Sequence, residues 1–212
     1  MNGSRLDLFS QNGTLSPKDV TPWQTFSGMG MTFHLQSYDW DSCACLSYLT
    51  MRTFLGVMKM ETLICTPYAK DMPLFSYDLI NALGRKTLLV EVYDTLMEPA
   101  DLSAMQAVKE SYRDLNDKVL KSAWYDSMRL QPSTAKTGPK ARLSALASEM
   151  TEAYIGLFTS AREVDPDAKT ARNNTYVEGL INNGGPAFDT ISRMLGTDAA
   201  KSLFRRFIFG TE

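Results

Sequence analysis

The sequence predicts an α+β protein in which an antiparallel sheet comes first along the chain and helices follow. From Met31 to Asp94, apolar or alternating segments rich in aromatic and β-branched residues are separated by short turns. After Pro99 the apolar residues recur at helical spacing. A run of strands followed by a run of helices is typical of a sheet covered by helices.

The strands are expected in the first half of the chain. MTFHLQSYDW (31–40) alternates, and the apolar run 47–67 is interrupted by Gly56, which indicates a turn between two strands rather than one helix. PLFSYDLI (73–80) and TLLVEVYDTL (87–96) follow, joined by a turn at NALGRK. Because parallel strands need crossovers of about a dozen residues, these short turns imply an antiparallel meander.

The helices are expected in the second half. Apolar spacing predicts helices over 101–123 and 141–161, with a short strand at 124–133 and a loop at 134–142 between them. Polar residues 165–174 indicate a loop or a fraying end. The expected end of the chain is a break at 182–186, a helix over 188–195 closed by Gly196, and a helix over 199–209 capped by Thr197 and Asp198.

The chain is expected to form one domain. Residues 1–22 are polar, with Gly, Asn, Ser and Pro, and predict a tail or a short edge element, whereas 23–212 form the domain itself. A hydrophobic fraction of 44% and a charged fraction of 22% are those of an ordinary globular protein.

Charge and hydropathy exclude several classes of partner. The net charge of -2, without any Lys/Arg run, argues against nucleic acid. No apolar run approaches ~18 residues, so we expect no membrane span and no membrane partner. The N-terminus lacks a signal pattern, so we expect a cytoplasmic protein, or one of the plastid stroma if a transit peptide has been removed. Nothing in the sequence argues against a monomer.

Metal and histidine chemistry are poorly supported. Cys43 and Cys45 lie too close together for a CxxC motif, Cys65 stands alone, and His34 is the one histidine. We therefore expect reduced thiols and no metal site. Acid–base chemistry, if present, falls to carboxylates.

Asp78 stands out within DMPLFSYDLI (71–80), where it lies among apolar residues. A charge in such surroundings is costly unless it is paired or neutralised. Asp78 is therefore either an exposed turn residue or an acid with a shifted pKa.

The stretch 67–80, P-Y-x-x-D-M-P-L-F-S-Y-D-L-I, resembles the segment P-x-x-x-D-L-P-x-F-G-x-D-[LI] of ferredoxin-dependent bilin reductases, with Ser76 in place of the usual Gly. The chain end is also similar, in Met194-Leu195-Gly196, Asp198-Ala199-Ala200 and Phe207-Ile208-Phe209 before Glu212. The resemblance implies a three-layer α/β/α sandwich with a central antiparallel sheet, and a bilin between the sheet and the C-terminal helices.

The resemblance also implies an activity. Biliverdin or a related linear tetrapyrrole would be reduced by single electrons from reduced ferredoxin (2Fe-2S), without a bound metal or flavin, and side chains would supply the protons. Heme oxygenase or a bilin-accepting protein are further partners to consider. By its place in the motif, Asp78 matches the central proton donor of the family, and Glu61 or Thr62 falls where relatives carry His or Asn. Glu61 would share a proton network with Asp78, or face solvent.

Four further positions are carried over to the substrate site. Thr87 falls where relatives direct a hydroxyl towards a propionate, and it shares a strand face with Leu89 and Glu91. Glu91 would be a second acid or lie at an exposed end. Arg129 lies near the arginine that holds a propionate, or it is a surface residue.

Gly185 is a departure from the family. It occupies the position where many relatives have a second catalytic Asp, just before Pro186. A missing acid would mean a two-electron reduction, protons delivered by water, or an inactive carrier. Three hypotheses therefore remain: a bilin reductase, a bilin carrier of the same fold, and an unrelated α+β interaction protein.

Overall fold

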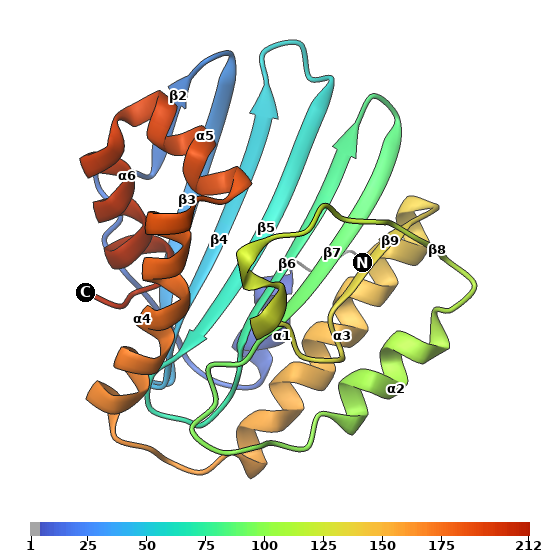
Figure 1. Cartoon of the computed structure of the whole chain (residues 1–212), viewed down its shortest axis with the longest axis vertical. Coiled ribbons are helices and arrows are strands. Elements are labelled where there is room, and N and C mark those ends of the chain that lie inside the picture. Colours follow the sequence, from blue (N-terminus) through green and yellow to red (C-terminus); the bar gives the residue numbers. More distant parts are fainter. Residues whose placement is uncertain (1–4) are drawn as a thin grey trace.

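In the computed structural model, which describes residues 5–212, nine strands form one antiparallel sheet (Figure 1). Along the sheet the strand order is β1-β3-β4-β5-β6-β7-β9-β8, and β2 also pairs with β3. The strands are β1 (Leu15–Pro17), β2 (Thr25–Gly28), β3 (Met31–Trp40), β4 (Ala44–Thr53), β5 (Met58–Pro67), β6 (Leu74–Ala82), β7 (Arg85–Tyr93), β8 (Asn116–Asp117) and β9 (Thr134–Thr137).

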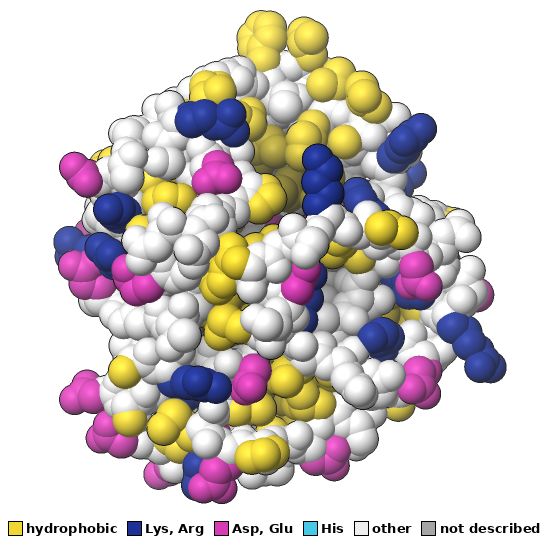
Figure 2. Space-filling model, in the orientation of Figure 1, with side chains coloured by type: hydrophobic (Ala, Val, Ile, Leu, Met, Phe, Trp, Pro, Cys, Tyr) yellow, Lys and Arg dark blue, Asp and Glu magenta, His cyan; other side chains and the backbone are white. Residues whose placement is uncertain are grey.

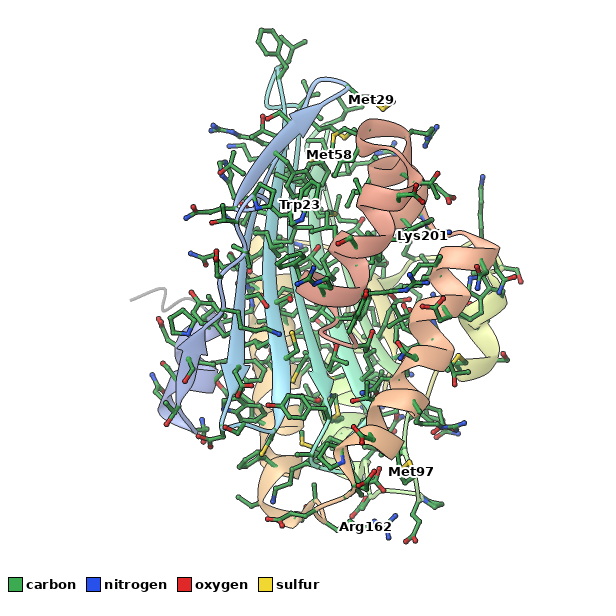
Figure 3. All side chains as sticks on the ribbon, turned by 90° about the vertical axis from the view of Figure 1, so that its left-hand side faces the viewer. Trp23, Met29, Met58, Met97, Arg162 and Lys201 are labelled. Carbon is green, nitrogen blue, oxygen red and sulfur yellow. The ribbon has the colours of Figure 1, made fainter. Side chains whose placement is uncertain are left out.

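Helices cover both faces of the sheet. They are α1 (Arg5–Gln11), α2 (Ser103–Ser111), the 3-10 helix η1 (Trp124–Met128), α3 (Lys140–Ser160), α4 (Pro166–Asn183), α5 (Pro186–Leu195), α6 (Thr197–Ser202) and the π-helix η2 (Leu203–Ile208). We call the face packed on α4, α5, α6 and η2 the front face, and the face packed on α1, α2 and α3 the back face. Figure 3 views the sheet edge-on, with the C-terminal helices on one side.

Each face has its own buried core, which confirms the three-layer sandwich. Phe75 and Tyr77 of β6 pack in the back-face core, whereas Leu74 packs in the front-face core with Tyr176 of α4. Successive side chains of a strand point to opposite faces. This alternation decides which polar residues can meet.

The predicted meander from β3 to β7 is confirmed. Gly56 has φ 65° in the turn between β4 and β5, and Leu83 and Gly84 have φ 50° and 77° between β6 and β7. Such left-handed residues suit tight hairpin turns, whose twist matches that of the strands. Gly196 ends α5 with φ 86°, as expected for a helix C-terminus.

Several predicted elements in the second half were wrong. The helix at 101–123 ends at Ser111, residues 124–133 hold η1 rather than a strand, and residues 134–137 form β9 on the outer side of β7. Residues 166–174 belong to α4. Thr197 and Asp198 make no side-chain cap, because Gly196 is the residue before α6.

The helix α4 escaped prediction because its first half buries polar side chains. Lys169 and Asn173 are both fully buried, so the usual apolar stripe is missing there. Its start does carry a signal, since Asp165 accepts a hydrogen bond from the Ala168 N–H at 2.9 Å and Pro166 follows it.

The N-terminal segment contains more than the predicted tail or edge element. β1 is an edge strand paired with β3, but α1 precedes it and packs on the back face. Phe9 is fully buried there, with its ring centroid 4.9 Å from that of Trp40. Two buried side chains on one short helix give too little sequence signal for a periodicity argument.

A buried ion pair fixes α4 to the start of β6. The Lys169 ammonium donates to the Asp71 carboxylate at 3.2 Å and to the carbonyls of Met72 and Thr95 at 2.8 and 2.6 Å. Asp71 also accepts the backbone N–H of Met97 at 2.8 Å. Burial acts to raise the pKa of Asp71, but these hydrogen bonds and the Lys169 charge outweigh it and lower that pKa.

Lys169→Ala is expected to lower the free energy of unfolding by about 3–5 kcal/mol, because it removes the buried cation paired with Asp71 and leaves that buried carboxylate with the half-exposed Arg162 alone. Denaturant unfolding followed by circular dichroism measures the loss. The matched control is Lys201→Ala on α6, which is expected to change stability by less than about 0.5 kcal/mol. A loss at Lys169 no larger than at Lys201 would contradict the assigned role.

Candidate functional site

The front face gathers polar side chains around Asp78 at its centre. Thr62 of β5 and Leu89 of β7 are the direct cross-strand partners of Asp78 on either side. The period of two places Thr87 and Glu91 on the same face as Leu89. The structure therefore brings together five of the predicted site residues, from three adjacent strands.

Asp78 is only partly accessible and has one neutral hydrogen-bond partner. The Thr62 hydroxyl donates to its carboxylate oxygen Oδ1. Burial raises the pKa of Asp78 to about 6, with the Thr62 hydrogen bond acting downwards and the nearby Glu91 charge acting upwards. An acid with this pKa holds and releases a proton close to neutral pH.

Glu91 is paired rather than free. Arg129 donates to its oxygen Oε1 from Nε at 3.0 Å and also from Nη2, and the same guanidinium donates to Asp126. The Arg129 carbon Cζ lies 5.0 Å from the ring centroid of Tyr125. Arg129 thus lies on the expected face, but its charge is engaged within the protein and is not a free grip for a propionate.

Aromatic rings close the lower part of the front face. The ring centroid of Tyr93 lies 4.1 Å from that of Tyr176 on α4 and 5.9 Å from that of Tyr125 on η1. Trp124 lies 5.9 Å from Tyr176 by the same measure. A Cβ at Gly179 would come within 2.2 Å of the Trp124 ring, so the glycine lets η1 pack on α4. These rings form an apolar wall beside Asp78.

Figure 2 shows a hollow in the upper half of this face, with hydrophobic side chains in its depth and Lys or Arg side chains beside it. An apolar depression with a few polar groups is the usual form of a small-molecule site. The front face therefore has both the shape and the chemistry for an apolar ligand that receives a proton.

Lys118 is a functional candidate that sequence reasoning missed. Its ammonium lies 3.4 Å from the hydroxyl of the buried Thr87. The side chain is exposed, so it adds a positive charge at the border of the front face. Lys118 lies in a segment for which apolar spacing predicted a helix, and only the fold, in which that helix ends at Ser111, places it next to Thr87.

Gly185 lies before α5 with extended backbone (φ −178°), which any residue adopts. Its neighbour Gly184 accepts a hydrogen bond from the Trp124 indole at 2.9 Å, so this loop is attached to η1. The nearest acid in sequence, Asp189, is exposed in the first turn of α5. No carboxyl group therefore stands at residue 185 itself.

Glu61 lies on the back face, opposite Asp78, so the expected proton network between them is wrong. Its oxygen Oε1 accepts from the Tyr77 hydroxyl at 2.8 Å and from Arg5. Arg5 also donates to the hydroxyl of Ser144 at 2.7 Å. Adjacent residues of a strand face opposite ways, so Thr62 takes the place beside Asp78 and Glu61 ties α1 and α3 to the sheet.

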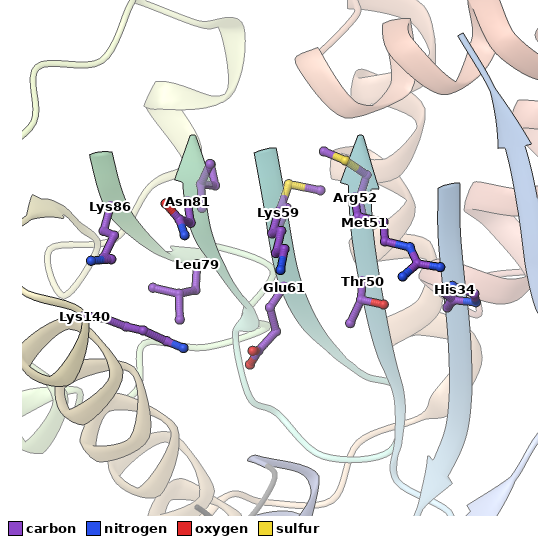
Figure 4. A pocket seen from close by; sticks show the side chains of 12 residues that line it. His34, Thr50, Met51, Arg52, Lys59, Glu61, Leu79, Asn81, Lys86 and Lys140 are labelled. Carbon is purple, nitrogen blue, oxygen red and sulfur yellow. The ribbon is translucent and has the colours of Figure 1, made fainter. Parts of the chain in front are cut away.

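A second hollow, of about 420 Å³, lies on the uncovered part of the back face (Figure 4). Its polar lining includes Arg52, Lys59, Lys86 and Lys140, together with Glu61. Asp78 does not line it, and the acid that does is paired with Arg5. This hollow therefore lacks a proton donor of the kind found on the front face.

Within residues 5–212 no group of three or more His, Cys, Asp or Glu side chains is placed to hold a metal ion. No helix there is long and apolar enough to cross a membrane. Cys65 is buried, and burial raises the pKa of its thiol to about 12.

No family model and no curated protein matches the sequence. Among solved structures, the chain matches phytochromobilin synthase from tomato, crystallised in complex with biliverdin, with a TM-score of 0.75 and 14% identity. The match covers 98% of this chain and 80% of that one. The chain has the bilin-reductase fold. The resemblance of residues 67–80 predicted this fold, and the match confirms it.

Asp78→Asn is expected to stabilise the protein above pH 6. The folded-state pKa is raised, so the native state is penalised as pH rises from about 4 through 6, and the penalty vanishes where both states are protonated. A tenfold change in proton affinity is worth ~1.4 kcal/mol, so the gain is roughly 2–3 kcal/mol at pH 7.

The test is the free energy of unfolding of Asp78→Asn and of the parent between pH 4 and 8. The exposed Asp189→Asn is the matched control for the removal of one carboxyl group. A difference for Asp78→Asn that is constant with pH would contradict the raised pKa.

Proposed function

We propose that this protein binds biliverdin or a related linear tetrapyrrole on the front face and reduces it with electrons from ferredoxin. The observation that carries the proposal is Asp78, a buried acid with a pKa of about 6 among the polar side chains of the front face. The fold shared with a protein crystallised with biliverdin supports it.

The residues suit the chemistry of such a reduction. Each double bond reduced takes up two electrons and two protons, and a bilin is a large apolar plate with two propionates. The protonated carboxyl of Asp78 gives one proton to the pigment and becomes a carboxylate. The Thr62 hydroxyl then stabilises that carboxylate by donating to it. Because Asp78 is partly accessible, solvent can restore its proton.

Thr87 and Lys118 are proposed to hold a propionate at the border of the site. Lys118 supplies the charge and Thr87 a hydroxyl beside it. Arg129 is instead proposed to hold Glu91 in place, since both of its hydrogen-bonding edges are engaged.

The runner-up function is a bilin carrier that does not turn its pigment over. Gly185 favours it, because no carboxyl group stands where many bilin reductases have a second acid. The two functions differ in a single experiment. The purified protein is titrated with biliverdin by absorbance, and ferredoxin, its reductase and NADPH are then added without oxygen. New product bands support the reductase, an unchanging shifted spectrum supports the carrier, and no shift contradicts both.

Asp78→Asn is expected to slow pigment reduction by about 10²–10⁴-fold, the usual contribution of a positioned general acid. Biliverdin affinity should remain close to that of the parent, because Asn keeps the size of the side chain. Single-turnover absorbance kinetics measures the rate, and Asp189→Asn serves as the control. Turnover at the parental rate would remove Asp78 from the mechanism.

Lys118→Ala is expected to weaken biliverdin binding about twofold to fivefold, as for an ion pair at an exposed position. Lys118→Arg should restore binding by keeping the charge. Both are measured by absorbance titration, with Lys121→Ala as the control from the same segment. Equal affinity of Lys118→Ala and the parent would exclude the propionate contact.

A further inference from the structure

Large hydrophobic side chains protrude from the hairpin tips at one end of the sheet. Met29 in the β2–β3 turn is 62% exposed, and Leu83 in the β6–β7 turn is 81% exposed. In the β4–β5 turn, Phe54, Leu55 and Val57 are 89%, 78% and 48% exposed. We call these five residues the tip patch. Exposed apolar groups that lie together mark interaction surfaces, whereas scattered ones do not.

The three hairpin turns that carry the tip patch are joined to one another by backbone hydrogen bonds. The Phe54 N–H donates to the carbonyl of Gly30 in the first turn at 2.7 Å, and the Leu83 N–H donates to the carbonyl of Val57 at 2.9 Å. The three turns lie side by side at the top of Figure 1, and Met29 is labelled at the same end in Figure 3. The five apolar side chains thus lie on adjacent turns at one end of the sheet.

Basic side chains lie directly behind this edge. Arg52 and Lys59 are cross-strand partners on β4 and β5, and Arg85 and Lys86 begin β7. Like charges placed directly opposite each other destabilise a sheet. Within residues 5–212 these four side chains make no hydrogen bond and no ion pair. Glu61, the acid on β5 near Lys59, is already paired with Arg5.

The spacing of the two features fits a bilayer surface. Arg52 and Lys59 lie two residues before Phe54 and after Val57, and a strand rises about 3.3 Å per residue. The cations therefore lie some ~7–10 Å behind the apolar tips. Interfacial segments bury their apolar side chains about 5–10 Å deep, with basic residues at the level of the anionic headgroups.

We propose that this end of the sheet docks on an anionic membrane surface, with the tip patch inserted among the lipids. Arg52, Lys59, Arg85 and Lys86 then contact headgroup phosphates, and the hollow on the back face takes up a headgroup beside Lys59 and Lys86. The contact is additional to the pigment site, and it needs no membrane-spanning segment.

A lipid surface fits this end better than a protein partner does. The apolar side chains project from convex tips, whereas a protein interface has an apolar centre enclosed by a polar rim. The whole chain carries a net charge of -2, so the molecule outside this basic end is acidic. An anionic surface would repel the acidic part of the molecule and favour contact through the hairpin tips and the cations behind them.

Flotation of the full chain with vesicles tests the proposal. Binding is expected with vesicles of phosphatidylcholine and phosphatidylglycerol, and not with phosphatidylcholine alone. Phe54→Ser with Leu55→Ser, and separately Arg52→Gln with Lys59→Gln, should each lower the bound fraction about tenfold or more. High salt should weaken binding by screening the charges.

Matched controls come from the same chain. Met97→Ser with Val119→Ser removes two other exposed apolar side chains, and Arg113→Gln with Lys121→Gln removes two other exposed charges. These pairs should bind like the parent. The proposal is wrong if the parent does not float with anionic vesicles, if the tip variants bind as well as the controls, or if inorganic phosphate alone displaces the protein. Biliverdin binding, measured in parallel, reports on the pigment site independently.

Discussion

The buried ion pair between Asp71 and Lys169 is the contact on which the arrangement of the front face depends. It joins the segment before β6 to the first turn of α4, and the backbone of the loop after β7 donates to the same carboxylate. The position of α4 sets that of Tyr176, and through Gly179 that of Trp124 and η1. The two acids of DMPLFSYD thus have separate roles, since Asp71 holds the layers together and Asp78 lies beside Thr62 and Leu89 on the front face.

Strand alternation gives the two faces of the sheet opposite electrostatic characters. On the back face, Glu61 is compensated by Arg5 and joins α1 and α3 to the sheet. On the front face, Asp78 has a neutral hydroxyl as its partner, and a second carboxylate lies on the next strand. The Glu61 carboxylate is held by a charge pair, whereas burial raises the pKa of Asp78 against the opposing hydrogen bond from Thr62. Glu61 and Thr62 are neighbours on β5. Glu61 belongs to the ion-pair network of the back face, and Thr62 belongs to the proton-exchanging site of the front face.

The sequence predicted the parts of the fold that repeat or break regularly. The meander, the turn at Gly56 and the long helix α3 all follow from alternation, glycine or apolar spacing. It could not predict α4, because buried Lys169 and Asn173 are stabilised by partners distant in sequence. Strand alternation did place Asp78, Thr62 and Thr87 on one face. The sequence could not predict that Lys118 lies beside Thr87 or that Arg129 pairs with Glu91, because these contacts join residues distant in sequence. Pairing among side chains is a property of the packed layers and not of a local pattern.

The most direct test of the central claim is isotope-edited infrared spectroscopy of the Asp78 carboxyl group, with and without biliverdin. A protonated carboxyl gives a C=O stretching band that an ionised one lacks. We expect a band that persists up to about pH 6, is absent from Asp78→Asn, and shifts when biliverdin is added. A band that disappears near pH 4, as for an ordinary Asp, or one that biliverdin leaves unchanged, would contradict it.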